Sequence, residues 1–142
     1  MIAAIARHVS IVAGLSGLLA AAVPGLLVWQ RLSRNPFAGP FVRYYLLEMA
    51  LIGAAVFITI IARGAAAAPA AWAACGVTTA FVFAAGATIG ALYLPASVLF
   101  ALSGVLAHVA ARRPRIFHLL LGAGAAALQL GLMAGVAAIG RS

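Results

Sequence analysis

Long apolar stretches separated by short polar segments make up almost the whole chain. Because a membrane-spanning helix needs about 20 mostly apolar residues, these stretches are typical of transmembrane helices. The pattern predicts five spans, over residues 8–30, 41–62, 69–91, 96–111 and 116–140. The loops are very short and leave no room for a catalytic module outside the membrane. We therefore expect one domain, residues 1–142, folded as an all-α polytopic transmembrane bundle.

Turn-forming residues and charges set the boundaries of these spans. Residues 31–40 hold two prolines, a glycine and an asparagine, which mark a loop. Residues 65–111 carry no charge, and one helix of that length would be about 70 Å long, against a hydrocarbon core of ~30 Å. We expect this stretch to turn at residues 90–95, where an interfacial tyrosine precedes a proline. A four-span bundle stays open if one segment is re-entrant or lies at the interface.

The composition agrees with a membrane protein. Hydrophobic residues make up 67% of the chain and charged residues 7%, whereas about a quarter of a soluble domain is charged. The net charge of +8 comes from nine arginines scattered between apolar stretches, which is typical of contacts with lipid head groups and not of a nucleic-acid binder. The preference for alanine, glycine and arginine suggests GC-rich codons, so we expect the inner membrane of a bacterial cell.

Five spans divide the arginines between the two sides of the membrane. The side that holds the N-terminus, called side A here, carries five of them: Arg7, Arg63, Arg112, Arg113 and Arg115. The opposite side, side B, carries the other four. This difference leaves the orientation open. We expect the side-A arginines to contact phospholipid head groups.

Small residues recur at four-residue spacing in three of the predicted spans. The stripe in the first span is Ala13, Gly17, Ala21 and Gly25; in the fifth it is Ala123, Ala127, Gly131 and Gly135; in the third it is Gly86 and Gly90. Residues four apart share a helix face, and small side chains let two backbones approach closely. The stripes therefore predict packing faces, although a chain rich in alanine and glycine also produces them by chance. The pattern leaves open whether the fifth-span stripe meets this chain or another protein.

Glu48 is the one acidic residue, and it lies in the second span. It is five residues past Arg43, about 7.5 Å deeper along a helix. An ionised acid at this depth in the membrane is costly, so two roles are open. Glu48 carries a proton or cation in a transporter, or it pairs with Arg43, Arg34 or a neighbouring subunit. Tyr44 lies on the same face, one turn away. We favour the structural interpretation. Gln129 also needs an interhelical hydrogen bond, and a protonated Glu48 is one candidate partner.

The three histidines, His8, His108 and His118, all fall near side A in the five-span topology. His108 and His118 flank a basic turn at similar depth, so antiparallel neighbours would bring their imidazoles together. Two histidines can ligate a heme iron or help to build a copper or zinc site. However, side A offers no carboxylate to orient them, and its arginines repel a cation. We therefore predict no cofactor and keep heme as the weaker alternative.

Three functional hypotheses remain. The chain lacks the common nucleotide-binding, hydrolase and metalloprotease motifs, and it has no aspartate for a Ser-His-Asp triad. We expect a non-enzymatic accessory or structural subunit that packs against larger membrane-protein partners, with membrane lipids around it and no nucleic acid. The first alternative is a small homo-oligomeric transporter or channel with Glu48 as its coupling group. The second is a heme- or quinone-associated membrane anchor that uses His108 and His118.

Overall fold

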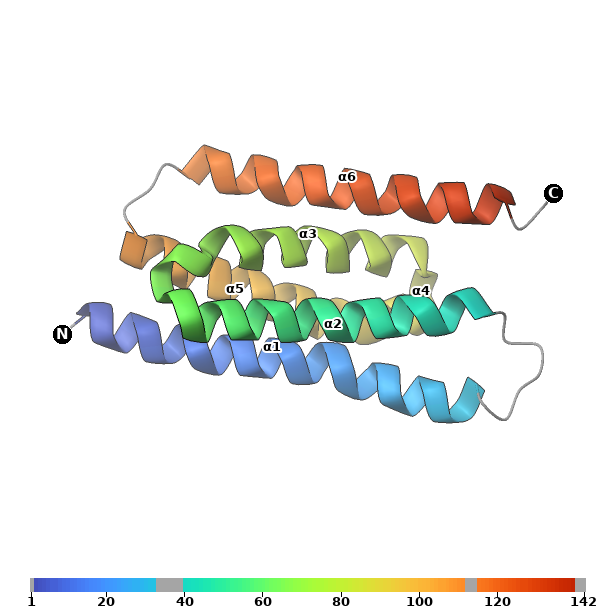
Figure 1. Ribbon diagram of the computed structural model, residues 1–142, viewed down its shortest axis with the longest axis horizontal. Coiled ribbons are helices and arrows are strands. Elements are labelled where there is room, and N and C mark those ends of the chain that lie inside the picture. Colours follow the sequence, from blue (N-terminus) through green and yellow to red (C-terminus); the bar gives the residue numbers. More distant parts are fainter. Residues whose placement is uncertain (1, 33–39, 112–114, 140–142) are drawn as a thin grey trace.

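The computed structural model describes residues 2–32, 40–111 and 115–139, and almost all of them are helical. The five long helices are α1 (Ile2–Leu32), α2 (Pro40–Arg63), α3 (Ala68–Ala84), α5 (Leu94–Ala111) and α6 (Arg115–Ile139). Three short helical elements join them, namely η1 (Gly64–Ala67), α4 (Gly86–Ile89) and η2 (Gly90–Tyr93). Successive long helices run antiparallel, as Figure 1 shows. The predicted all-helical bundle is confirmed.

Four apolar segments of the described residues are long enough to cross a membrane. Three of them lie within α1, α2 and α6, and the other begins in η2 and continues into α5. The segments are Arg7–Gln30, Val42–Arg63, Gly90–Val109 and Ile116–Ala138. The fifth helix, α3, is also apolar but has only 17 residues, a length of about 25 Å. The length and composition of these helices indicate a membrane protein. Side A corresponds to the end of the bundle at which α1 begins and α2 ends (Figure 1).

The turn between α3 and α5 begins earlier than the sequence predicts. The third span was expected to continue to residue 91, whereas α3 ends at Ala84. Gly86 has a φ of +70°, a conformation that side chains with a Cβ adopt only at a cost. The backbone then passes so close to the carbonyl of Val82 that a Cβ at Gly90 would collide with it. Gly86 and Gly90 therefore build a turn, and the predicted third-span stripe is wrong.

The core has two parts along the length of the bundle. The first is built mostly of alanines around Val56, Ile60 and the fully buried Phe100. The second contains larger side chains, with Phe81 packed against the edge of Tyr93 at a ring distance of 5.1 Å. These contacts join α1, α2, α3 and α5 into one packed unit.

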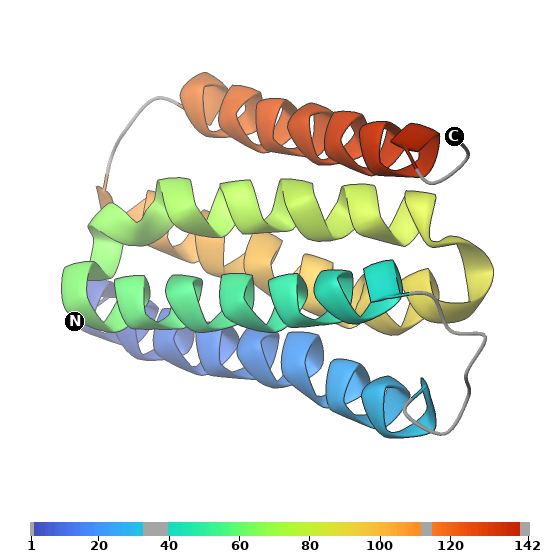
Figure 2. The ribbon, with the colours of Figure 1, turned by 45° about the vertical axis from the view of Figure 1, so that its right-hand side comes forward.

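Helix α6 lies at the margin of this unit. Figure 2 shows it beside α3, on the side away from α1. The two helices approach so closely that a Cβ at Gly76 of α3 would collide with the carbonyl oxygen of Gly122 in α6. Both positions are glycine, so the backbones meet with no side chain between them. Only 11% of the apolar segment Ile116–Ala138 of α6 is buried, against 44% for the segment Gly90–Val109.

Candidate functional site

His108 and His118 lie side by side at the side-A end of the bundle. His108 is near the end of α5 and His118 is in the first turn of α6. Their ring centroids are 5.1 Å apart, and the rings meet edge to face at 76°. The antiparallel course of α5 and α6 thus brings together the two imidazoles that the sequence singles out.

Trp72 of α3 completes this cluster, and the sequence analysis did not identify it. Its indole lies over the backbone of α5, where a Cβ at Gly104 would be 2.9 Å from the indole Nε1. On the other side, a Cβ at Gly122 of α6 would be 3.1 Å from the Trp72 carbonyl oxygen. Two glycines on different helices therefore make room for this residue. Gly104 and Gly122 are visible in the sequence, but they point to Trp72 only once α3, α5 and α6 are known to be neighbours.

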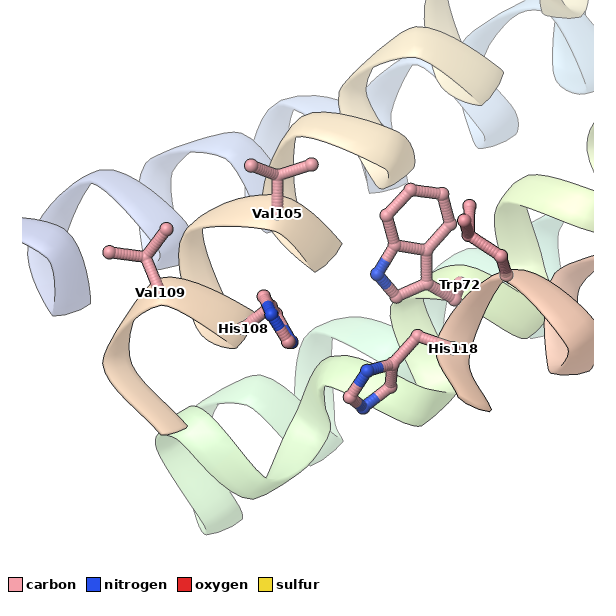
Figure 3. A pocket seen from close by; sticks show the side chains of 6 residues that line it. Trp72, Val105, His108, Val109 and His118 are labelled. Carbon is pink, nitrogen blue, oxygen red and sulfur yellow. The ribbon is translucent and has the colours of Figure 1, made fainter. Parts of the chain in front are cut away.

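A cavity of about 290 Å³ lies among these three helices. Its lining residues are Trp72, Val105, His108, Val109, His118 and Leu119. Figure 3 shows the indole of Trp72 and the imidazoles of His108 and His118 facing a common space, with Val105 and Val109 along α5. The two imidazoles and the indole are the polar groups of an otherwise apolar lining.

Three nitrogens around the cavity have no hydrogen-bond partner among the residues that the structure describes. They are Nδ1 of His108, Nδ1 of His118 and Nε1 of Trp72, and all three atoms are buried. His118 itself is only 2% exposed. A buried polar group without a partner costs about 1–3 kcal/mol. Three such atoms around one cavity make it a candidate ligand-binding site.

The other predicted ligand, His8, is exposed on α1 and does not line this cavity. In residues 2–32, 40–111 and 115–139, no group of three or more histidine, cysteine or acidic side chains could hold a metal ion. An axial histidine pair must hold heme iron between its rings. The edge-to-face contact of His108 and His118 is a different arrangement.

The predicted lipid-contacting arginines are only partly described. Arg7 and Arg63 are exposed at the side-A end, where α1 begins and α2 ends. Arg112 and Arg113 lie outside the described residues, as does the side chain of Arg115, whose backbone begins α6.

Glu48 and Gln129 join two helices that are far apart in the sequence. Nε2 of Gln129 in α6 donates a hydrogen bond to Oε2 of Glu48 in α2, at 3.2 Å. Gln129 is 3% exposed, although most of the surface of α6 is open. This bond satisfies a polar side chain in the middle of an apolar helix.

Glu48 also faces the outside of the bundle. Its side chain is half-buried and borders a shallow groove along α2 that includes Tyr44, whose exposed fraction is 68%. Arg43 lies over the ring of Trp29 in α1, with its guanidinium carbon 5.9 Å from the ring centroid, within the range of a cation–π interaction. Arg34, another predicted partner of the acid, lies outside the described residues.

Hydroxyl groups link the inner helices. Thr79 of α3 and Ser97 of α5 are hydrogen-bonded, and the Sγ of Cys75 lies 3.9 Å from the Oγ of Ser97. Ser10 of α1 and Ser103 of α5 lie with their Oγ atoms 3.5 Å apart. These contacts fix neighbouring helices without charged groups.

The small-residue stripes of α1 and α6 have different surroundings. All four positions of the first stripe are buried; a Cβ at Gly17 would lie 2.7 Å from the ring of Phe100. All four positions of the second stripe are exposed, and no atom lies within 4 Å of a Cβ placed at Gly131 or Gly135. We call residues Ala123, Ala127, Gly131 and Gly135 the outer stripe of α6.

Taken together, the fold and these contacts define a helical bundle with four candidate transmembrane helices and polar links between them. No protein-family model, curated protein or solved structure matches the chain.

Proposed function

We propose that the protein is a non-enzymatic accessory subunit of a membrane-protein complex in the bacterial inner membrane. In this proposal all five long helices cross the bilayer, and the outer stripe of α6 docks against a larger membrane protein. The observation that carries the proposal is the exposure of the outer stripe.

The central position of α3 supports its assignment as the fifth span. It lies beside α2, α5 and α6 and buries seven residues, among them Thr78 and Phe81. A helix of about 25 Å is slightly shorter than the ~30 Å hydrocarbon core. The helical elements η1 and α4 come directly before and after it and would extend the helical segment toward the full thickness of the core.

The shape of the outer stripe favours a protein neighbour over lipid. Within a bilayer, helices associate by close backbone packing, and a stripe of alanine and glycine permits it. The same kind of stripe on α1 packs within the bundle, with Gly17 next to Phe100. The outer stripe would pack in the same way against a helix of another protein.

Charge favours a different protein over a second copy. The chain has nine arginines and one acid, with a net charge of +8. A parallel second copy would place like charges such as Arg7 and Arg63 at the same side of the membrane, whereas a partner with acidic loops would complement them.

The test is purification of the tagged protein from its native membrane in a mild detergent, followed by native mass spectrometry. The proposal predicts a larger membrane protein in fixed stoichiometry with the chain. A monomer or a homo-oligomer with no other protein bound would contradict it.

A small homo-oligomeric transporter is the second candidate, because the carboxyl group of Glu48 is half-buried and borders an open groove. In this case Glu48→Gln should abolish solute or proton flux in proteoliposomes while the oligomer stays intact. Glu48→Gln keeps a hydrogen-bonding group opposite Gln129, so the bundle should fold. Unchanged flux in this variant would remove Glu48 as the coupling group.

A further inference from the structure

We propose that the cavity between α3, α5 and α6 binds the head group of a membrane quinone, a planar conjugated ring with carbonyl oxygens. The inference concerns a binding site on the isolated chain and does not depend on the docking of α6. It rests on the buried nitrogens, the apolar lining and the depth of the cavity.

The nitrogens supply what the carbonyl oxygens of a quinone need. The indole Nε1 of Trp72 always carries a proton, and a neutral histidine carries one on either ring nitrogen. Nε1 of Trp72 and Nδ1 of His108 and His118 are buried and lack partners in the described part of the chain. Because these atoms have almost no accessible surface, the rings must turn slightly toward a ligand before it can accept hydrogen bonds from two of them. Each such bond would remove about 1–3 kcal/mol of cost.

The size and lining of the cavity suit a neutral ring better than a charged group. A volume of about 290 Å³ is at the small end of ligand sites, which begin near 300 Å³. Val105, Val109 and Leu119 form the apolar part of the wall, and the aromatic rings can stack on a conjugated ligand. A phosphate would lose its hydration in these surroundings.

The cavity opens toward the membrane at the depth where a quinone head group lies. Val105, Val109 and Leu119 are 44%, 56% and 56% exposed, so the wall that they form borders lipid. His108 is the last residue but one of the apolar segment Gly90–Val109, and His118 is the third residue of Ile116–Ala138. The head group would therefore sit near the membrane surface while an isoprenoid tail leaves between α5 and α6 into the hydrocarbon core.

The two tryptophans allow a test with an internal control. Trp72 lines the cavity, whereas Trp29 lies near the end of α1 on side B. In Trp29→Phe, reconstituted in phosphatidylcholine nanodiscs, titration with decylubiquinone should quench Trp72 fluorescence and saturate at one quinone per chain. In Trp72→Phe, the remaining Trp29 should show only the gradual quenching that follows from quinone dissolved in the lipid.

Substitutions in the Trp29→Phe background then locate the site. His108→Phe and His118→Phe each keep an aromatic ring but remove the nitrogens, and each should raise the Kd about tenfold, the effect of losing one buried hydrogen bond. His8→Phe is the matched control, because His8 lies at the same end and outside the cavity, and its Kd should not change. Val105→Phe alters an exposed position and fills the cavity while both histidines stay in the chain, so it should abolish saturable quenching even if a histidine variant fails to fold.

Three results would overturn the proposal. The first is quenching of Trp72 that rises without saturation, as for Trp29. The second is an unchanged Kd in Val105→Phe and in both histidine variants. The third is stoichiometric hemin binding with a Soret band that is lost in His108→Phe and His118→Phe, which would assign the histidines to heme.

Discussion

Helices α1 and α6 carry the same pattern of small residues, yet one stripe is inside the bundle and the other is outside it. In α1, Gly17 and Ala21 are buried against α5 and α2. In α6, Gly131 and Gly135 are exposed and have no neighbour within 4 Å of an added Cβ. A small-residue stripe therefore indicates a face that can pack closely, but it does not tell which molecule packs there.

The residues opposite each stripe explain why the α1 stripe is buried and the α6 stripe is exposed. At about 100° per residue, His118, Gly122 and Gln129 lie within roughly 40° of one another on α6. All three are buried, and the bond from Gln129 to Glu48 together with the close approach of Gly122 to Gly76 fixes this face inward. The outer stripe lies on the other side of the helix and must face away. The outward face of α1 is instead made of large residues such as Leu15, Leu19 and Leu26, which suit lipid.

The largest expected effect concerns the inner face of α6. Gly76→Leu places a side chain where the carbonyl of Gly122 lies, and a backbone cannot move aside as a flexible side chain can. We expect a loss of about 3 kcal/mol in the free energy of unfolding, measured by SDS titration with circular dichroism. The matched control is Gly124→Leu, because Gly124 is exposed with nothing within 4 Å; it should unfold as the wild type does. Equal stabilities for the two variants would show that α6 is not held by this contact.

The second prediction compares the two stripes directly. Gly17→Leu forces the buried ring of Phe100 to move and should cost about 2 kcal/mol of stability. Gly131→Leu meets no atom of the chain and should leave the midpoint of thermal unfolding of the isolated protein unchanged. If Gly131→Leu destabilises the isolated chain as much as Gly17→Leu does, the outer stripe packs inside the bundle after all.

A smaller effect is expected at the link between α6 and α2. Gln129→Leu removes the hydrogen bond to Glu48 and should cost about 1 kcal/mol. A double-mutant cycle of Gln129→Leu with Glu48→Leu should give a coupling energy of about 0.6 kcal/mol, the average for hydrogen bonds between membrane helices. The readout is again unfolding in SDS. Additive losses in the double variant would mean that the two side chains do not interact.

The apolar pattern of the sequence predicts most of the fold. The expected bounds of the second, fourth and fifth spans lie within two residues of α2, α5 and α6, because these helices end at charges or prolines that the sequence displays. The end of α3 was not predicted, because the sequence does not show which glycine of an apolar stretch adopts a positive φ, as Gly86 does.

The candidate site was predictable only in part. The proximity of His108 and His118 follows from two antiparallel neighbours joined by a short turn. Trp72 was not foreseen, because its place depends on the packing of α3 between α5 and α6. The rotation of α6 about its axis was equally hidden, since it is set by contacts with residues as distant in sequence as Glu48 and Gly76.

Binding of a larger membrane protein to the outer stripe of α6 can be tested with variants of the stripe itself. The double variant Gly131→Leu/Gly135→Leu is purified from its native membrane in mild detergent and compared with the wild type by native mass spectrometry. Ala55→Leu serves as the control, because Ala55 is exposed on α2 and the change adds a leucine side chain to the surface away from the outer stripe. If the outer stripe binds the partner, the partner remains bound in the wild type and in Ala55→Leu and is lost in the double variant. A partner that stays bound to the double variant would contradict binding at the stripe.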